Sequence, residues 1–397
     1  MLIIEIILLF ILTGHAFILS LLALLARLPY RKSDSISQLD MSVVIKARNE
    51  AKNLPACLDS LLQAQGFVPG RLVLVDDGSR DATRAVMDNY AVQTGATVIA
   101  IHHEWTNQAQ RDADRQTALS NPRFFAYDEA GYLPNLENRQ RAVAASMEHV
   151  QSGAVALTDG DCTVKPGWLN STREMLKRFA LVCGYVDFVP GKRLLFDHIV
   201  AVEALLLQVA SAAAYRMGKP GGAMGANLAY RVNAYRELGG YPALGPSLTE
   251  DAQIALAVAK KHLVAYNTDP AAVVEHHDRL GVWRFIKQRA FWLLGGARLS
   301  LFWVITPLFL AMDAIAPWVA LILALTGTVP VWFIVLGFGG RLIGDLACWA
   351  AFRRLDMRVK PWDFVAAWLF QAIYLPILPV LILPGFRRLI EGKTRKG

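Results

Sequence analysis

The two ends of the chain restrict its fold more than any other feature, because they are long and apolar enough to cross a lipid bilayer. Residues 1–26 are nearly all apolar, with only Glu5 and His15 against the trend, and about 20 such residues span the hydrocarbon core. A cleaved signal peptide carries its positive charge before the apolar run. Here the charge follows the run, at Arg27, Arg31 and Lys32. We therefore predict an uncleaved transmembrane anchor over residues 1–27, with the following residues in the cytoplasm.

Three further apolar blocks follow residue 300, at 301–326, 329–352 and 363–385. The short "TGTVP" between the first two predicts a membrane hairpin, and the basic "RRLDMRVK" after them predicts a cytoplasmic loop. The third block contains Pro376, Pro379 and Pro384, and a basic tail follows it. Because a simple span would place that tail outside, we predict transmembrane or re-entrant helices over 301–390, in a multi-pass protein of the plasma (inner) membrane.

Cysteine and charge content exclude several classes of function. The four cysteines have no metal-binding spacing, and a cytoplasmic domain would keep them reduced. The net charge of +8 is spread over the membrane flanks and residues 279–298, without a base-stacking motif. This pattern favours a lipid bilayer as partner and argues against nucleic acid.

Residues 40–280 alternate between short β-branched runs and helical patterns. The predicted strands include "SVVIKA", "RLVLVDD", "ATVIAI" and "AVALTD", and the predicted helices include residues 53–65, 138–150 and 168–179. Such alternation predicts a Rossmann-like α/β fold with a mostly parallel sheet covered on both faces. Ligands bind such sheets at the carboxyl ends of the strands.

Two of the predicted strands end in acidic pairs. Asp76 and Asp77 end "LVLVDD", and Asp159 and Asp161 end "ALTDGD". One such pair is typical of a turn, but carboxylate oxygens also bind Mg²⁺ or Mn²⁺. Two acidic pairs at one edge of a sheet favour a cation or a polar ligand over a turn alone.

A third acidic pair opens the predicted helix in "PSLTEDAQIALAVAKK". Thr249 is expected at its N-cap, with Glu250 and Asp251 in the first turn. Acidic residues stabilise a helix N-terminus by themselves. Asp251 is also suited to act as a general base. The residue types alone leave both interpretations open.

The motifs "VVIKARNE", "LVLVDDGS", "LTDGD" and "LTEDAQIAL", in this order, resemble those of membrane-anchored family 2 glycosyltransferases of the GT-A fold. The resemblance covers roughly residues 41–292 and implies a GT-A domain over 40–280. It implies inverting, Mg²⁺- or Mn²⁺-dependent transfer of a single sugar from a nucleotide sugar, UDP by the family's general habit. The implied acceptor is a membrane lipid or polyprenol.

The resemblance also implies roles for single residues. Asp77 and Glu50 would contact the nucleotide. Asp161 would bind the metal, with Asp159 beside it on the donor. Asp251 would be the base, next to Glu250.

Other positions are implied less directly. Gly225 and Asn227 would line the donor and acceptor site, although a glycine-rich turn explains them as well. Arg139 and Arg141 are offered for the phosphates. His276 or its neighbour His277 would add a third metal ligand, although adjacent histidines are more often one buried and one solvated.

Three departures from the family pattern limit the resemblance. The Q-x-x-R-W motif of processive members keeps Gln288 and Trp292 but has Phe291 in place of arginine, which weakens the alternative of a polysaccharide synthase; Arg289 or Arg284 is left as a substitute. Lys46 stands where proline is usual, and we assign it no role. Residues 102–137 form a polar insert, read as a loop in preference to a mobile lid.

Residues 281–300 mix aromatic and basic side chains, which predicts an amphipathic helix at the membrane interface. A lipid or polyprenol acceptor needs such a helix, whereas a soluble sugar acceptor does not. A third hypothesis is a non-catalytic membrane scaffold that binds a nucleotide or glycan.

Overall fold

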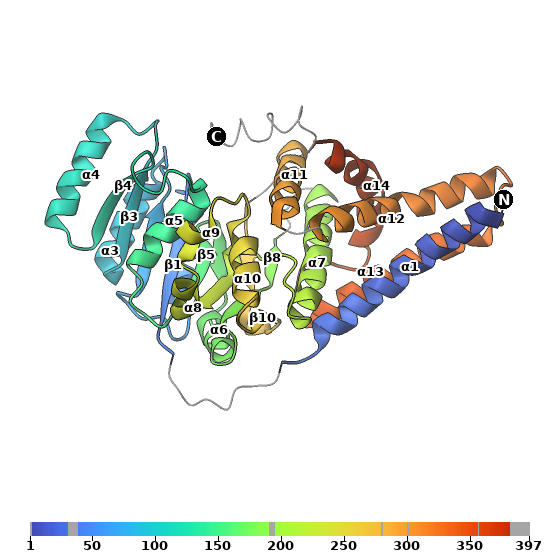
Figure 1. The fold of residues 1–397 in the computed structure, drawn as a ribbon, viewed down its shortest axis with the longest axis horizontal. Helices are drawn as coiled ribbons and strands as arrows, with labels where there is room; N and C mark the ends of the chain where they lie inside the picture. Colours follow the sequence, from blue (N-terminus) through green and yellow to red (C-terminus); the bar gives the residue numbers. More distant parts are fainter. Residues whose placement is uncertain are drawn as a thin grey trace. The chain divides into compact units, whose positions relative to one another are not determined.

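The computed structural model describes residues 2–30, 39–189, 195–278, 281–299, 302–355 and 357–381. The chain forms two compact units (Figure 1). The α/β unit contains residues 30–186 and 218–278, and the helical unit contains residues 1–29, 187–217 and 279–397.

The α/β unit is built on an eight-stranded sheet with the order β10-β7-β9-β5-β1-β2-β3-β4. Its strands are β1 (Met41–Ala47), β2 (Leu72–Asp76), β3 (Thr97–His102), β4 (Phe124–Asp128), β5 (Ala154–Asp159), β7 (Leu181–Gly184), β9 (Leu228–Arg231) and β10 (Val264–Asn267). Only β9 runs antiparallel to its neighbours, β5 and β7. Val44 and Ile45 of β1 are fully buried, as expected for a sheet covered on both faces. The predicted mostly parallel α/β fold is confirmed.

Helices and short strands complete this unit. The helices are α2 (Leu54–Leu62), α3 (Thr83–Thr94), α4 (Gln108–Ser120), α5 (Asn138–Glu148), α6 (Trp168–Leu176), α8 (Val232–Glu237), α9 (Gly240–Leu244) and α10 (Glu250–Ala259), with 3-10 turns at Gly225–Asn227 and Pro270–Ala272. A small sheet has the order β6-β11-β8, from β6 (Cys162–Val164), β11 (Val274–His276) and β8 (Val186–Phe188). The chain leaves the α/β unit at β8.

The polar insert at residues 102–137 is not a loop, and that prediction was wrong. It contains α4 and β4, and β4 extends the sheet by parallel pairing with β3. Asn107 caps α4 by accepting a hydrogen bond from Gln110 N at 2.8 Å. Asp114 is the only fully buried residue of α4, so the helix has no apolar stripe from which it could be predicted.

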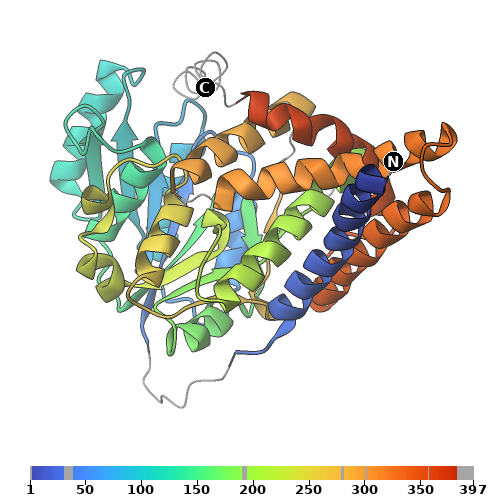
Figure 2. The same cartoon turned by 45° about the vertical axis from the view of Figure 1, so that its right-hand side comes forward.

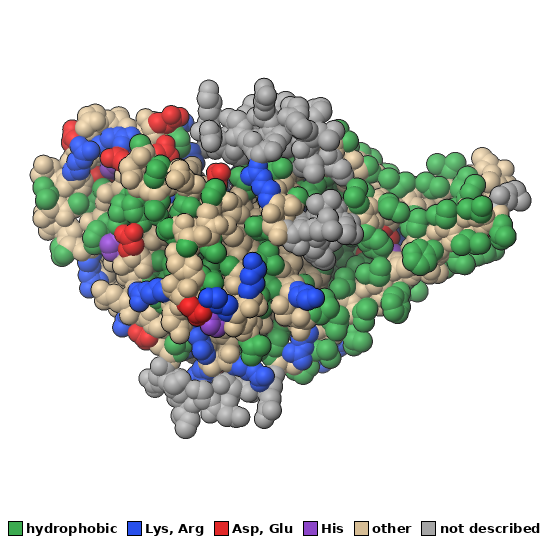
Figure 3. Space-filling model, in the orientation of Figure 1, with side chains coloured by type: hydrophobic (Ala, Val, Ile, Leu, Met, Phe, Trp, Pro, Cys, Tyr) green, Lys and Arg blue, Asp and Glu red, His purple; other side chains and the backbone are tan. Residues whose placement is uncertain are grey.

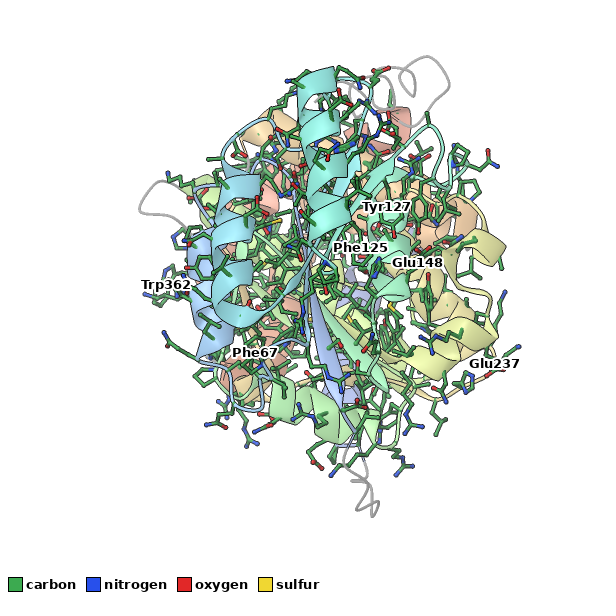
Figure 4. The ribbon with its side chains drawn as sticks, turned by 90° about the vertical axis from the view of Figure 1, so that its left-hand side faces the viewer. Phe67, Phe125, Tyr127, Glu148, Glu237 and Trp362 are labelled. Carbon is green, nitrogen blue, oxygen red and sulfur yellow. The ribbon has the colours of Figure 1, made fainter. Side chains whose placement is uncertain are left out.

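Side-chain pairs hold the insert in place. Tyr127 of β4 donates to Glu148 at 3.1 Å, and Phe125 stacks on His149 with ring centroids 3.7 Å apart. Figure 4 shows Phe125, Tyr127 and Glu148 close together. On the other side, His102 Nε2 lies 2.9 Å from the buried Asp114 Oδ2. The insert is therefore held by polar and aromatic side-chain pairs rather than by an apolar helix face.

The helical unit contains α1 (Leu2–Arg27), α7 (Leu195–Arg216), α11 (Val282–Leu299), α12 (Phe302–Leu325), α13 (Trp332–Phe352), a 3-10 turn at Arg353–Leu355, and α14 (Asp363–Leu381). Four segments are long and apolar enough to span a membrane: Leu2–Arg27, Leu195–Arg216, Leu308–Leu325 and Trp332–Leu355. The first of these segments coincides with the predicted anchor, and the last two coincide with the predicted membrane hairpin.

Helix α7 is a segment that the sequence analysis did not single out. It lies inside the range 40–280 yet belongs to the helical unit. Residues 363–378 of α14 form a shorter apolar helix. Arg31, Lys32, Pro384 and the basic tail lie outside the described residues.

Glycines let α1 pack closely against α13, and the two helices run side by side in Figure 2. A Cβ atom added at Gly340 would lie 3.1 Å from Leu12 O, and one at Gly344 would lie 3.2 Å from the His15 ring. The outward faces of α1, α12 and α13 carry hydrophobic side chains, as Figure 3 shows. Such a large apolar surface suits a bilayer.

Candidate active site

Strand register brings the predicted acidic residues to one edge of the sheet. Lys46 near the end of β1 pairs with Asp159, the last residue of β5. On the other side of β1, Ala47 pairs with Asp76, the last residue of β2. The carboxyl ends of three adjacent parallel strands therefore meet here, as the sequence predicted.

Lys46 joins this edge to α10. Its Nζ donates to Glu250 Oε1 at 2.9 Å and lies 3.6 Å from Asp159 Oδ1. Burial lowers the pKa of Lys46, but Asp159 and Glu250 raise it by more, so the ammonium stays charged. Sequence reasoning assigned this residue no role, because its partner Glu250 is 204 positions away.

Glu250 and Asp251 open α10 but have different environments. Burial raises the pKa of Glu250, but Lys46 and Arg139 outweigh it and lower the pKa. Burial, followed by the Glu250 charge, raises the pKa of Asp251 to about 7. Two carboxylates with separated pKa values are typical of acid and base sites.

Backbone groups orient Asp251. Its Oδ2 accepts from Gly225 N at 3.0 Å, and its Oδ1 accepts from Ala252 N at 2.8 Å. Thr249 occupies the N-cap position of α10 but makes no side-chain capping bond. The predicted position of the cap is therefore correct, whereas its hydrogen bond is absent.

Asp161 and His276 form a pair beside Asp159. Antiparallel pairing of β11 with β6 places His276 opposite Cys162, and its Nε2 lies 3.2 Å from Asp161 Oδ2. Burial raises the pKa of Asp161, but the bond with His276 lowers it to about 2. His277 turns elsewhere, with Nε2 2.8 Å from Thr163 Oγ1.

These residues have the chemistry of a divalent-cation site, although they do not form a closed one. Asp159 Oδ1 is buried and accepts no hydrogen bond from the described residues. Two carboxylates and an imidazole are donors that Mn²⁺ accepts. Within the described ranges, no group of three or more His, Cys, Asp or Glu residues is close enough to hold a metal. Asp159, Asp161 and His276 are therefore the described residues here whose donor chemistry suits such a cation.

Asp76 and Asp77 have separate surroundings at the end of β2. Asp76 Oδ1 accepts from Ser79 N at 3.0 Å and so closes the turn. Asp77 Oδ1 lies 2.8 Å from His103 Nε2. His103 belongs to the insert and was not among the predicted site residues.

Glu50 lies beside the glycine of the acidic motif, because a Cβ atom added at Gly160 would be 3.5 Å from Glu50 Cβ. The backbone N of Glu50 donates to Thr83 Oγ1 at 2.7 Å. Glu50 therefore lies close to the Asp159–Asp161 motif.

Asn227 is buried and makes three hydrogen bonds within the α/β unit. Its amide nitrogen donates to Tyr185 O and Ala272 O, both at 2.9 Å. Its Oδ1 accepts from Trp168 Nε1 at 2.9 Å. Asn227 therefore stabilises the backbone and the Trp168 side chain around the site.

The two candidate phosphate-binding arginines differ. Arg139 is exposed as a residue, although its charged group lies against the protein. Desolvation of that group lowers its pKa, but four carboxylates raise it by more, in order Glu250, Asp159, Asp251 and Asp161. Arg141 is buried and donates to Leu136 O at 2.9 Å and to Glu129 Oε2 at 3.5 Å. Arg139 faces the acidic edge, whereas Arg141 supports the insert.

Family models match the chain over most of its length. The model described as Glycosyl transferase family group 2 matches residues 154–378, more than half of the chain, and Glycosyl transferase family 2 matches residues 42–114. The chain belongs to the family 2 glycosyltransferases. This enzyme is therefore a transferase, and the resemblance drawn from its four motifs is confirmed.

A solved structure supports the fold of this glycosyltransferase. The mannosyltransferase PcManGT from Pyrobaculum calidifontis, in complex with GDP-Man and Mn²⁺, is 16% identical over 96% of this chain and 98% of its own, with a TM-score of 0.57. TarS from S. aureus in complex with UDP-GlcNAc is 12% identical over 90% and 92%, with a TM-score of 0.38. No curated protein matches the chain.

Gln288 and Trp292 of the glycosyltransferase lie on α11, in the helical unit. Both contact Arg289: its Nη1 donates to Gln288 Oε1 at 2.6 Å, and its guanidinium lies 4.2 Å from the Trp292 ring centroid. Arg289 is buried and donates to Glu203 at 2.5 Å. Arg289, a candidate substitute for the missing motif arginine, thus holds α11 to α7.

Proposed function

We propose that this glycosyltransferase moves a single sugar from a UDP-sugar to the hydroxyl of a membrane lipid or polyprenol, with inversion at the anomeric carbon. One observation carries the proposal. The Asp161–His276 pair and the Asp251 carboxylate, with its raised pKa, belong to one α/β unit, where both aspartates raise the pKa of Arg139. Lys46 bonds Glu250 while lying beside Asp159.

Asp251 acts as the general base in this proposal. Its carboxylate takes the proton of the acceptor hydroxyl, whose oxygen forms a bond to the anomeric carbon as the bond to the diphosphate breaks. A single displacement of this kind inverts the anomeric configuration. A base with a pKa near 7 is matched to proton transfer at neutral pH.

Asp161, Asp159 and His276 would hold a divalent cation, which supplies Lewis-acid neutralisation of the diphosphate leaving group. Arg139 adds a positive charge at the same edge, next to the four carboxylates that raise its pKa. Glu50 and Asp77 would contact the nucleotide. Mn²⁺ and GDP-Man together in the P. calidifontis mannosyltransferase support a metal with a nucleotide sugar as donor.

We further propose a multi-pass membrane protein with the α/β unit in the cytoplasm and α11 at the interface. Three of the helices that are long and apolar enough to span a membrane, α1, α12 and α13, support this arrangement. The fourth, α7, starts from and returns to the α/β unit, so it does not count as a crossing. A catalytic unit tethered to the membrane suits an acceptor that is held in the same membrane. A processive synthase is less well supported, because Phe291 replaces the motif arginine and Arg289 bonds Glu203.

The test measures nucleotide release by the detergent-purified full chain across a panel of nucleotide sugars. Each donor is assayed with Mn²⁺ or EDTA, and with or without membrane-lipid extract, beside Asp161→Ala and Asp251→Asn. We expect metal-dependent release from one donor, stimulated by lipid and lost in both variants. Nucleotide binding without release from any donor would contradict the proposal and support a scaffold.

A further inference from the structure

The imidazole of His103 is fully buried between two carboxylates. Its Nε2 lies 2.8 Å from Asp77 Oδ1, and its Nδ1 lies 2.5 Å from Glu129 Oε2. Both acceptors are satisfied only when both ring nitrogens carry protons. Burial lowers the pKa of His103, but the two carboxylates raise it by more.

The segment around His103 is fixed by further contacts. Trp105 stacks on the imidazole with centroids 4.3 Å apart, and its Nε1 donates to Gly78 O at 3.0 Å. Arg111 Nη2 donates to His103 O at 2.6 Å. The nearby positive charges are Arg48 and Arg80 over Trp105, and Arg141 beside Glu129. The insert therefore holds this ring in one position.

Gly78 makes room for the ring directly after Asp77. A Cβ atom at Gly78 would lie 2.2 Å from His103 Cδ2, and the glycine has a φ of +69°. Both the space and the left-handed backbone favour glycine here. The imidazole thus occupies the approach to Asp77 Oδ1.

This arrangement leaves Oδ2 as the Asp77 oxygen that is fully open to a ligand, because one acceptor site of Oδ1 is taken by the His103 ring, which also crowds that oxygen. Oδ1 faces His103, whereas Oδ2 makes no hydrogen bond with any residue that the structure describes. Uracil and thymine present a single N–H on their pairing edge. Guanine presents two adjacent donors, N1–H and the N2 amino group, which together need both oxygens of a carboxylate in a fork geometry. A guanine at Asp77 would keep one donor unpaired, and unpaired polar groups are costly.

We propose that His103 is a positioning residue that restricts Asp77 to one acceptor oxygen, and that the site therefore selects uridine or thymidine diphosphate sugars over guanosine diphosphate sugars. This inference rests on the proposed contact of Asp77 with the nucleotide. Glu129 keeps the His103 ring in this position by its contact with the second ring nitrogen. The specificity would thus come from the insert rather than from the family motifs.

The experiment measures UDP and GDP affinity by calorimetry with the full chain in detergent and Mn²⁺. The variants are His103→Ala, His103→Gln and the matched control His102→Gln, since His102 is also buried but contacts Asp114. We expect wild type to favour UDP by about tenfold or more. His103→Ala should remove most of this preference, His103→Gln should recover part of it through its side-chain N–H, and His102→Gln should retain it.

Donor kinetics separate positioning from a general loss of structure. His103→Ala should raise KM for the donor sugar while kcat changes by less than about threefold. An unchanged UDP-to-GDP ratio in both His103 variants, or a wild type that favours GDP, would overturn this inference alone. Absence of binding of either nucleotide to wild type would instead overturn the proposed function and this inference with it.

Discussion

Lys46 Nζ donates to Glu250 Oε1 at 2.9 Å and thereby ties the first strand of the sheet to the first residue of α10. Both side chains are almost wholly buried. The pair fixes Glu250 as a charged group next to Asp251, whose pKa Glu250 helps to raise. The electrostatics of the proposed base thus depend on a lysine that stands where the family usually has proline.

Lys46→Met should destabilise the enzyme by about 3 kcal/mol, because it leaves the buried Glu250 charge without its partner. The midpoint of thermal unfolding in detergent measures this loss. The exposed Lys52 provides the control, and Lys52→Met should leave the midpoint unchanged. The double variant Lys46→Met with Glu250→Gln should recover part of the stability. A midpoint equal to that of wild type in Lys46→Met would show that the pair contributes nothing.

Asp251 should give the reaction a pH dependence near neutrality. Its pKa is raised to about 7, so the base is protonated and inactive below that pH. We therefore expect kcat/KM to rise as the pH increases through about 7 and then to level off. Asp251→Asn should lower kcat by about 10²-fold or more while the nucleotide still binds. A flat profile between about pH 6 and 8 would remove Asp251 from the role of base.

His276→Ala should weaken activation by Mn²⁺ by about tenfold, because the imidazole lies beside Asp161. Titration of activity with Mn²⁺ gives the activation constant. His277→Ala is the matched control, since the His277 ring contacts Thr163. Equal activation constants for the two variants would exclude His276 as a ligand.

Gly344→Leu should disrupt the packing of α1 on α13, because even a Cβ atom at this position would lie 3.2 Å from the His15 ring. Overpacking of this kind costs about 1–3 kcal/mol. Gly339→Leu is the control, since a Cβ atom there meets nothing within 4 Å. Thermal unfolding in detergent should separate the two variants, and equal midpoints would contradict the close packing described here.

The sequence predicted features that depend on local periodicity and on strand ends. The strand "SVVIKA" and the acidic residues Asp77 and Asp159 lie where expected, because buried parallel strands have a recognisable composition and their carboxyl ends share an edge. The hairpin of α12 and α13 was predictable from the sequence as well, because its two long apolar runs are easily recognised.

Features that depend on distant partners were missed. Helix α4 has a polar sequence and buries only Asp114, so no apolar period marks it. His103 acquires its role from Asp77 and Glu129, each 26 positions away. Helix α7 interrupts the α/β unit in sequence, and it lies within the range 40–280 that was expected to form one GT-A domain.

The antiparallel direction of β9 limits the distance between the proposed base and the end of α7. Because β9 runs against its neighbours, the residues that precede it arrive at the acidic edge, and Gly225 N bonds Asp251 there. Only eight residues separate Gly225 from Arg216, the end of α7. A fully extended stretch of this length covers about 30 Å. This short connection limits how far the proposed base can lie from the end of α7, whatever orientation the α/β unit takes.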